Sequence, residues 1–325
     1  MIQYLVILLD DTSVSFCHYS NGSRKERRLM PLETLKAGIV YAMKENLSIQ
    51  FVYPAYELPQ AYREAIDSID HTDIKPANLA EEAEVVVFDG WEQTAGHAFK
   101  PGISYVLRTD RQSLFAHIGE VCTLLSQVER LNLVITDVEQ FTDADFDAYA
   151  HALKTMADAV EERYLSGQSV QVNLLTDRMM LDKMNNCGAG DTAITLAPDG
   201  QFYVCPAFYL AEEADGHGKL KTAIGDLRHG LDMKNPQLYR LDHAPICRHC
   251  DAFQCKRCVW LNRRTTYEVN TPSHEQCVMA HLEREASRVL LEDIRKHGTF
   301  LPKQADIKKL SYLDPFEVKK EWDKV

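Results

Sequence analysis

Short runs of Val, Ile, Leu and Phe alternate with longer segments of helical periodicity through the first 175 residues. This alternation is typical of successive strand–helix units around a parallel sheet. It predicts six strands, at Gln3–Leu9, Ile49–Tyr53, Glu84–Phe88, Ser104–Arg108, Leu131–Thr136 and Val170–Leu175. The clearest helices between them are Leu32–Lys44, Leu58–Ser68, Gln112–Val128 and Ala144–Tyr164. An open six-unit barrel and a doubly wound sheet both fit this α/β pattern.

Capping residues support two of these helix starts independently of the periodicity. Thr142, followed by Asp143 and Asp145, places an acceptor and negative charge where the first backbone N–H groups of a helix are free. Pro31, followed by Glu33, opens the earlier helix in the same sense. These signals concern structure and carry no information about chemistry.

The alternation stops after Leu175. Residues 185–273 hold most of the cysteines and show little continuous apolar periodicity, so bound metal rather than a hydrophobic core is expected to hold them. Beyond them, His281–Lys296 predicts a helix, and the residues from Leu301 predict a charged tail. The expected parts are therefore a barrel over 1–182, a small cysteine-rich domain over 183–280, and a C-terminal helix and tail over 281–325.

Composition narrows the classes of partner. The chain has 325 residues, of which 45% are hydrophobic, and a net charge of −12. Such a charge argues against nucleic acid, which is bound by clustered Lys and Arg. No segment approaches the ~20 apolar residues of a membrane span, and Tyr4–Leu9 reads as a buried strand because Asp10 and Asp11 follow it. We expect a cytoplasmic protein, because reduced thiols are then available to metal.

Seven of the nine cysteines lie between Cys187 and Cys277. Their spacing is Cys187-x12-Gly200-x4-Cys205, a gap, Cys247-x2-Cys250-x4-Cys255-x2-Cys258, a second gap, and Cys277. A zinc ribbon separates its two Cys-x2-Cys pairs by about 15 to 20 residues, so that they face each other across one ion. Here four residues separate the pairs, a spacing that suits ligands shared between two adjacent sites.

Two metal chemistries remain open at this point. Iron–sulfur clusters are the first, since bacterial ferredoxins also send the last cysteine of a close-spaced run to a second cluster. The other is a pair of zinc ions bound by the seven cysteines and one of His249, His274 or His281. Seven isolated structural cysteines at these spacings are the least expected alternative.

The cysteine spacing resembles the seven-cysteine SPASM domain of radical S-adenosylmethionine peptide-modifying enzymes, although the middle run is one residue shorter at two places. The run from Pro198 to Pro206, with its Pro-Asp-Gly turn, also resembles that domain. The resemblance implies two auxiliary [4Fe–4S] clusters. Cluster one would be bound by Cys187, Cys205 and Cys258, and cluster two by Cys247, Cys250, Cys255 and Cys277. Seven ligands leave one iron atom without a thiolate from the motif; a nearby side chain such as Asp191, a free cysteine or a substrate cysteine would complete it.

The upstream signatures of the same superfamily are missing. Its radical chemistry uses a Cys-x3-Cys-x2-Cys loop after the first strand, but the corresponding positions here are Asp10, Val14 and Cys17. The usual Gly-Gly-Glu-Pro turn after the second strand is replaced by a stretch that contains Tyr53 and Tyr56. The resemblance therefore implies a degenerate radical SAM-like barrel that neither binds nor cleaves S-adenosylmethionine by itself.

Candidate catalytic residues are weak. Cys17 precedes His18, but neighbouring residues on an extended chain face opposite sides and do not pair directly. Asp137 and Glu139 follow the fifth predicted strand, at the end where barrels place their sites. Cys122 is expected to lie in the core. The catalytic residues thus stay unknown, with Cys17, Asp137 and Glu139 as candidates.

Taken whole, the chain resembles the CXXX repeat peptide maturase family. The opening Tyr4–Tyr19 stretch and the Cys205–Tyr209 block carry the resemblance, which covers nearly all residues. It implies a role in modifying a ribosomally made peptide with repeated cysteines, in partnership with a true radical S-adenosylmethionine enzyme. A zinc-stabilised peptide-binding or scaffold protein and a stand-alone iron–sulfur enzyme acting on thiols are the alternatives.

Overall fold

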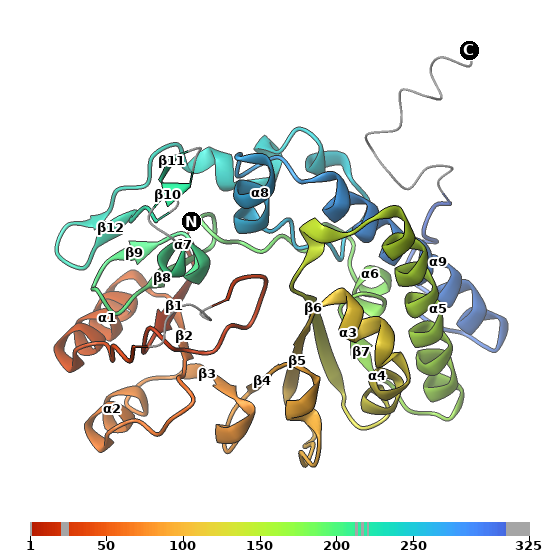
Figure 1. Cartoon of the computed structure of the whole chain (residues 1–325), viewed down its shortest axis with the longest axis horizontal. Coiled ribbons are helices and arrows are strands. Elements are labelled where there is room, and N and C mark those ends of the chain that lie inside the picture. The colour runs from red at the N-terminus through yellow and green to blue at the C-terminus, as the bar shows by residue number, and fades with distance from the viewer. Residues whose placement is uncertain (1, 21–25, 212–213, 216–217, 220, 310–325) are drawn as a thin grey trace.

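The protein is described from a computed structural model that covers residues 2–20, 26–211, 214–215, 218–219 and 221–309. Its core is one nine-stranded sheet with helices on its outer side (Figure 1). The strands of this sheet are β1 (Tyr4–Leu8), β2 (Ser48–Val52), β3 (His71–Pro76), β4 (Val85–Asp89), β5 (Ser104–Thr109), β6 (Arg130–Ile135), β7 (Gln171–Val172), β8 (Ala193–Leu196) and β9 (Phe202–Tyr203). The prediction of an α/β protein built on a large parallel sheet is confirmed.

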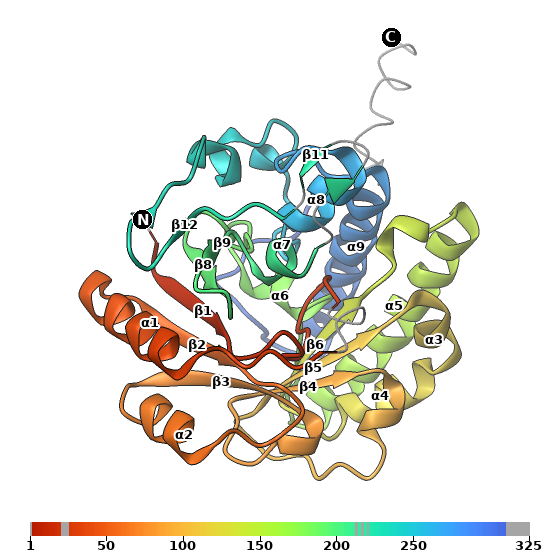
Figure 2. The ribbon, with the colours of Figure 1, turned by 60° about the vertical axis from the view of Figure 1, so that its left-hand side comes forward.

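Strand order distinguishes the two α/β architectures that the sequence left open. From β1 to β7 each strand pairs in parallel with the next in sequence, without the reversal of a doubly wound sheet. The strands form an arc rather than a flat layer (Figure 2). Beyond β1 the order continues with β8, which is parallel to β1, and then β9, which is antiparallel to β8. The cysteine-rich segment therefore adds two strands to the main sheet.

The helices are α1 (Leu32–Glu45), α2 (Gln60–Ile66), α3 (Arg111–Ala116), α4 (Ile118–Leu125), α5 (Asp143–Leu165), α6 (Thr176–Met180), α7 (Pro206–Leu210), α8 (Val259–Thr266) and α9 (His274–Lys296). Single 3-10 turns occur at Ala77–Leu79, Trp91–Thr94, Val138–Gln140, Pro236–Tyr239, Leu241–His243 and Cys247–His249. Two small hairpins join β10 (Ala214–Asp215) to β11 (Gly218–Lys219), and β12 (Gly225–Asp226) to β13 (Gly230–Leu231). The predicted cap of α5 is present, since Thr142 and Asp145 form a reciprocal capping box. Pro31 precedes α1 as predicted, at the N-cap position and without a side-chain cap bond.

The structure corrects several element predictions. Strand β3 was not predicted, because His71–Pro76 contains a single aliphatic residue, Ile74, and its strand form depends on pairing with β2 and β4. The strand predicted at Val170–Leu175 is limited to the two residues of β7. The helix predicted at Gln112–Val128 is divided at His117 into α3 and α4. The last helix begins at His274 rather than His281, with Ser273 as its N-cap. Of the predicted tail, residues 310–325 lie outside the described residues.

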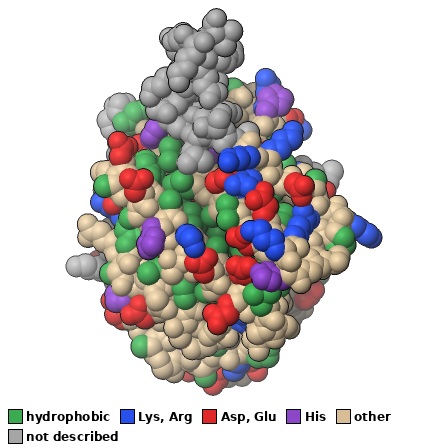
Figure 3. Space-filling view, turned by 90° about the vertical axis from the view of Figure 1, so that its right-hand side faces the viewer, with side chains coloured by type: hydrophobic (Ala, Val, Ile, Leu, Met, Phe, Trp, Pro, Cys, Tyr) green, Lys and Arg blue, Asp and Glu red, His purple; other side chains and the backbone are tan. Residues whose placement is uncertain are grey.

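Helices α5 and α9, both of 23 residues, pack along each other on one side of the molecule (Figure 1). A groove of about 260 Å³ between them is lined by apolar residues that include Ala157, Leu282 and Val289. Figure 3 views the molecule from this side and shows hydrophobic side chains among charged ones of both signs. None of the helices in the described part of the chain combines the length and apolar character of a membrane span.

Candidate iron–sulfur sites

The four predicted cluster-two cysteines come together around one cavity. Cys247, Cys250, Cys255 and Cys277 all line a space of about 370 Å³ between the 246–257 segment and the start of α9. They arrive from two segments that are distant in sequence, because Cys277 lies in the first turn of α9. A [4Fe–4S] cluster takes four cysteine thiolates, each on a different iron atom. The residues present therefore fit the group that the spacing predicts.

Backbone N–H groups are directed at three of the predicted ligand sulfurs. Ala252 donates to Cys250 Sγ, Arg257 to Cys255 Sγ and Leu261 to Cys258 Sγ, each with a nitrogen–sulfur distance of 3.4 Å. Such bonds stabilise a thiolate and are one of the means by which proteins set the potential of an iron–sulfur cluster. The turns that contain these cysteines thus place backbone N–H donors where cluster-bound thiolates would accept hydrogen bonds.

The cluster-one cysteines, Cys187, Cys205 and Cys258, lie beside this run. The Cys187 N–H donates to the Lys256 carbonyl at 2.8 Å, which brings the segment before β8 against the run from Cys247 to Cys258. Cys205 and Cys258 stand at the N-caps of α7 and α8. Burial, followed by the charges of Cys17, Cys187 and Cys258, raises the pKa of Cys205 well above its ordinary value. The segments that begin at Cys205 and Cys258 also meet, since the rings of Phe208 and Trp260 pack with centroids 5.4 Å apart.

Buried arginines accompany the cysteines, and sequence reasoning missed them. Arg257 is 1% exposed and donates to Asn186 at 2.9 Å and to the Tyr239 carbonyl. Burial lowers the pKa of Arg257, whereas the thiolates of Cys247, Cys187 and Cys255 raise it. Arg284, fully buried in α9, pairs with Asp251 at 2.9 Å. Cationic side chains offset the negative charge of a thiolate-bound cluster and tune its potential.

Two of the three histidines named as possible zinc ligands lie beside the cluster-two cysteines. Both His249 and His281 line the cluster-two cavity, and the Nε2 atom of His281 lies 3.4 Å from Cys250 Sγ. His274 instead packs edge-on against Phe146, with ring centroids 6.1 Å apart. Among the residues that the structure describes, no group of three or more His, Cys, Asp or Glu side chains is already arranged to hold a single metal ion.

The loop after β1, which includes Asp10, Val14 and Cys17, is held by hydrogen bonds. Asp10 is fully buried and accepts from the Thr12 N–H and hydroxyl at 2.7 and 2.6 Å. Its other carboxylate oxygen accepts from the Tyr56 hydroxyl at 2.8 Å. Asp11 accepts a hydrogen bond from Tyr209. The loop after β1 and the loop after β2 therefore contact each other through Asp10 and Tyr56.

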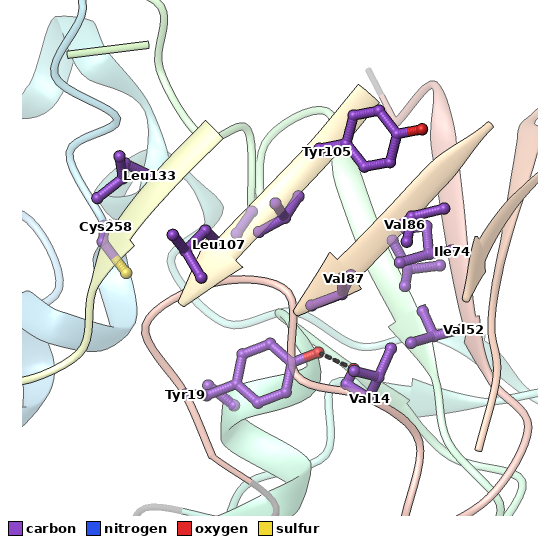
Figure 4. Close-up of a cluster of buried hydrophobic side chains, with 14 of the residues drawn as sticks. Val14, Tyr19, Val52, Ile74, Val86, Val87, Tyr105, Leu107, Leu133 and Cys258 are labelled. Carbon is purple, nitrogen blue, oxygen red and sulfur yellow. Dashed lines mark hydrogen bonds between the residues drawn. The ribbon is translucent and has the colours of Figure 1, made fainter. Parts of the chain in front are cut away.

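The same loop runs across the carboxyl ends of β4 and β5. Figure 4 shows Tyr19 just beyond the strands that carry Val87 and Leu107, with its hydroxyl directed at the Val14 carbonyl, 3.5 Å away. Cys258 lies at the edge of the same buried cluster, next to Leu133. Residues of the loop and of the cysteine-rich segment thus share one apolar environment.

Cys17 and His18 do not form a nucleophile–base pair in this loop. His18 Nδ1 lies 3.0 Å from the Ile135 carbonyl, and burial lowers the pKa of His18. Burial, followed by the charge of Cys187, raises the pKa of Cys17 to about 12. A buried thiol with a raised pKa is a poor nucleophile. Cys122 is partly buried in α4 and directs its thiol at the Thr155 carbonyl, 3.7 Å away.

The two acidic candidates are both engaged in ion pairs. Asp137 accepts from the Arg111 backbone N–H at 2.9 Å and also from the Arg111 guanidinium. Glu139 pairs with Arg264 of α8 at 2.7 Å. These contacts attach the loop after β6 to α3 and α8. They provide a structural role for both carboxylates, and a catalytic role stays a prediction.

Glu283 is a further carboxylate that sequence reasoning missed. It is 8% exposed in α9 and lines a small cavity of about 80 Å³ with Cys255 and Cys258. Burial raises the pKa of Glu283 to about 7, while hydrogen bonds from Tyr149 and Gln254 lower it. Only its position on the apolar face of a helix could have singled it out from the sequence.

A separate cavity opens at the carboxyl ends of the first four strands. It has a volume of about 560 Å³ and is lined by the loop after β1, with Thr12 and Ser15, and by residues after β3 and β4, among them Asn78, Gln93 and His97. Polar side chains therefore converge at the end of the sheet where parallel-strand proteins place their ligands.

Comparison with known proteins establishes the fold. No family model matches the sequence, and no curated protein matches it. The solved structure of anSMEcpe with bound AdoMet aligns with a TM-score of 0.57 and 14% identity, over 90% of this chain and 100% of that one. The structure of anSMEcpe with bound AdoMet and the Cp18Cys peptide aligns with a TM-score of 0.61 and 13% identity, over 90% of this chain and 99% of that one. Streptococcus suis SuiB bound to precursor peptide SuiA aligns with a TM-score of 0.50 and 12% identity, over 85% of this chain and 76% of that one. At these identities the likeness shows the shared fold alone.

Proposed function

We propose that this chain is a component of a peptide maturase that acts on a ribosomally made cysteine-repeat (CXXX) peptide. In this proposal it binds two auxiliary [4Fe–4S] clusters and the peptide, and a true radical S-adenosylmethionine enzyme is its partner. The observation that carries the proposal is the convergence of Cys247, Cys250, Cys255 and Cys277 on one cavity. When bound, such clusters supply electron transfer. The parts 1–182, 183–280 and 281–325 would be a degenerate radical SAM-like barrel, a SPASM-like domain, and a helix with tail.

The loop after β1 supports the absence of a radical-generating cluster of its own. Asp10 accepts three hydrogen bonds from protein groups, and Val14 is buried. Neither side chain is a thiolate, so the loop offers one sulfur where three are needed. We therefore propose that the isolated protein does not cleave S-adenosylmethionine.

The cavity at the carboxyl ends of β1 to β4 is the proposed docking place of the peptide. Its polar lining, including Asn78 and Gln93, offers amide groups to an extended backbone. Proteins of the same fold, anSMEcpe and SuiB, have been solved with peptides bound.

We propose that this chain also acts in the cytoplasm.

Anaerobic purification followed by metal analysis and a visible spectrum tests the cofactors. The proposal expects about eight iron and eight sulfide per chain and a brown protein. A colourless protein with two zinc ions would overturn it and favour a zinc-stabilised peptide-binding or scaffold protein, the alternative that the His281–Cys250 contact favours.

A second assay tests the division of labour. The loaded protein is incubated with S-adenosylmethionine and a strong reductant, and 5′-deoxyadenosine is measured. We expect none from the isolated chain, so its formation would refute the proposed dependence on a partner enzyme. Turnover of a thiol substrate with an electron donor and without a partner would instead indicate a stand-alone redox enzyme.

A further inference from the structure

We propose that Cys17 supplies the fourth thiolate of cluster one, so that cysteine alone binds both clusters. This inference rests on the proposed function, because it takes the cluster-one site to hold a [4Fe–4S] cluster. The motif provides seven cysteines, and two such clusters require about eight ligands. Cluster two already has four cysteines around its cavity, so the missing ligand belongs to cluster one.

The fold gathers the four cysteines from segments far apart in sequence. Cys258 belongs to the main buried cluster, and Cys17 and Cys205 pack against that cluster. The Cys187 N–H donates to the Lys256 carbonyl, two residues before Cys258, at 2.8 Å. Phe208 and Trp260, just past Cys205 and Cys258, pack with ring centroids 5.4 Å apart. Cysteines gathered from separate segments are the ligands that a four-iron cluster requires.

Hydrogen bonds hold the Cys17 backbone at the carboxyl end of β5. The Arg108 guanidinium, which is 3% exposed on β5, donates to the Cys17 carbonyl at 3.0 Å and to the Tyr19 carbonyl at 2.6 Å. Arg108 also pairs with Asp89 on β4. Three consecutive residues of the loop are thus held across the carboxyl ends of the sheet, where Cys258 also lies (Figure 4).

Two cavities are each lined by both the loop after β1 and residues at or near the cluster-one cysteines. His18, the neighbour of Cys17, lines the small cavity that Cys258 also lines. Tyr19 lines another, of about 170 Å³, with Ala207 and Trp260, which follow Cys205 and Cys258 by two residues each. The loop after β1 therefore meets the segments that begin at both of these ligands.

Ligation by Cys17 changes what cluster one can do. An iron atom with a protein thiolate has no open position for the thiolate of a substrate cysteine. Each thiol would release its proton on binding iron, since a metal-bound thiol is deprotonated.

The test compares the reconstituted wild-type protein with Cys17→Ala and with the control Cys122→Ala. Iron and sulfide are counted, and electron paramagnetic resonance spectra are recorded after reduction and after mild oxidation. We expect about eight iron in the wild type and in the control, falling in Cys17→Ala to about seven after oxidation, or about four if the whole cluster is lost. Added β-mercaptoethanol should change the spectrum of Cys17→Ala and leave that of the wild type unchanged.

The outcomes separate this inference from the proposed function. A Cys17→Ala protein that keeps about eight iron and the wild-type spectrum would overturn the inference and leave the proposed function standing. A wild-type protein without iron would overturn both. If Cys17→Ala does not fold, the spectrum of the wild-type protein is recorded with and without β-mercaptoethanol or a cysteine-containing peptide. A spectral change would reveal an open iron and contradict ligation by Cys17.

Discussion

The Tyr149 hydroxyl donates a hydrogen bond of 2.8 Å to Glu283 and so joins α5 to α9 inside the core. Gln254, from the cysteine run, donates to the other carboxylate oxygen of Glu283 at 3.1 Å. Burial raises the pKa of Glu283 to about 7 in spite of both bonds. A single carboxyl group therefore connects the helix pair to the region between the two proposed clusters.

Glu283 should make stability depend on pH. Its folded-state pKa is raised, so the protonated form favours folding, and that contribution is lost as pH rises from about 4.5 to about 7. We expect Glu283→Gln to raise the free energy of unfolding at about pH 8 by at most ~3 kcal/mol, and by less at about pH 6. Denaturant unfolding of equally metal-loaded proteins measures this. A pH dependence identical to that of the wild type would contradict the raised pKa.

Metal removal should loosen one part of the chain and spare another. The small apolar cluster formed by Met184, Ala244 and Cys247 is the separate core near cluster two, whereas the main sheet has an extensive core. We expect a chelator to increase hydrogen exchange over 241–258 and to leave the main sheet protected, because bound metal contributes directly to the folding of such regions. Uniform loss of protection, or no change, would argue against this division.

Tyr56→Phe tests the hydrogen-bonded loop after β1. The change removes a bond to the buried Asp10 carboxylate, which should cost about 1.5–3 kcal/mol, since bonds to charged groups are the stronger ones. Tyr62→Phe is the matched control, because its hydroxyl donates to the neutral Met30 carbonyl at 2.7 Å. Urea unfolding compares them, and a larger loss for Tyr62→Phe would contradict the role given to Asp10.

Asp137 and Glu139 should differ in their effect on stability. Asp137 is partly buried and receives two bonds from Arg111, so Asp137→Asn should cost about 1–3 kcal/mol. Glu139 pairs with Arg264, which is half exposed, so Glu139→Gln should cost less than ~1 kcal/mol. Peptide processing should follow the folded fraction in both variants. A loss of processing by a fully folded variant would instead support a catalytic carboxylate.

Arg108 is proposed as a positioning residue for Cys17. Arg108→Lys keeps the positive charge but loses the forked geometry that reaches two carbonyl groups and Asp89. We expect a lower iron content and an altered resonance signal of cluster one, with the cluster-two signal retained. Lys154→Ala, which breaks an exposed pair with Asp158, serves as the control. Equal iron content in both variants would count against positioning by Arg108.

The sequence by itself determined the features that depend on local pattern. Apolar runs predicted strands of a parallel sheet at Gln3–Leu9 and Glu84–Phe88, close to the observed β1 and β4, and Thr142 with Asp145 predicted the start of α5. The spacing from Cys187 to Cys277 predicted metal ligands, because neighbouring thiols on tight turns have few other uses.

Only the tertiary structure decided the rest. The polar segment of β3 becomes a strand because β2 and β4 pair with it, and β8 joins the sheet beside β1. Cys17 is separated from Cys187 by 169 residues, and no periodicity indicates their proximity. The loop that carries Cys17 is held by Arg108 on β5, a long-range interaction that a local pattern of residues does not encode.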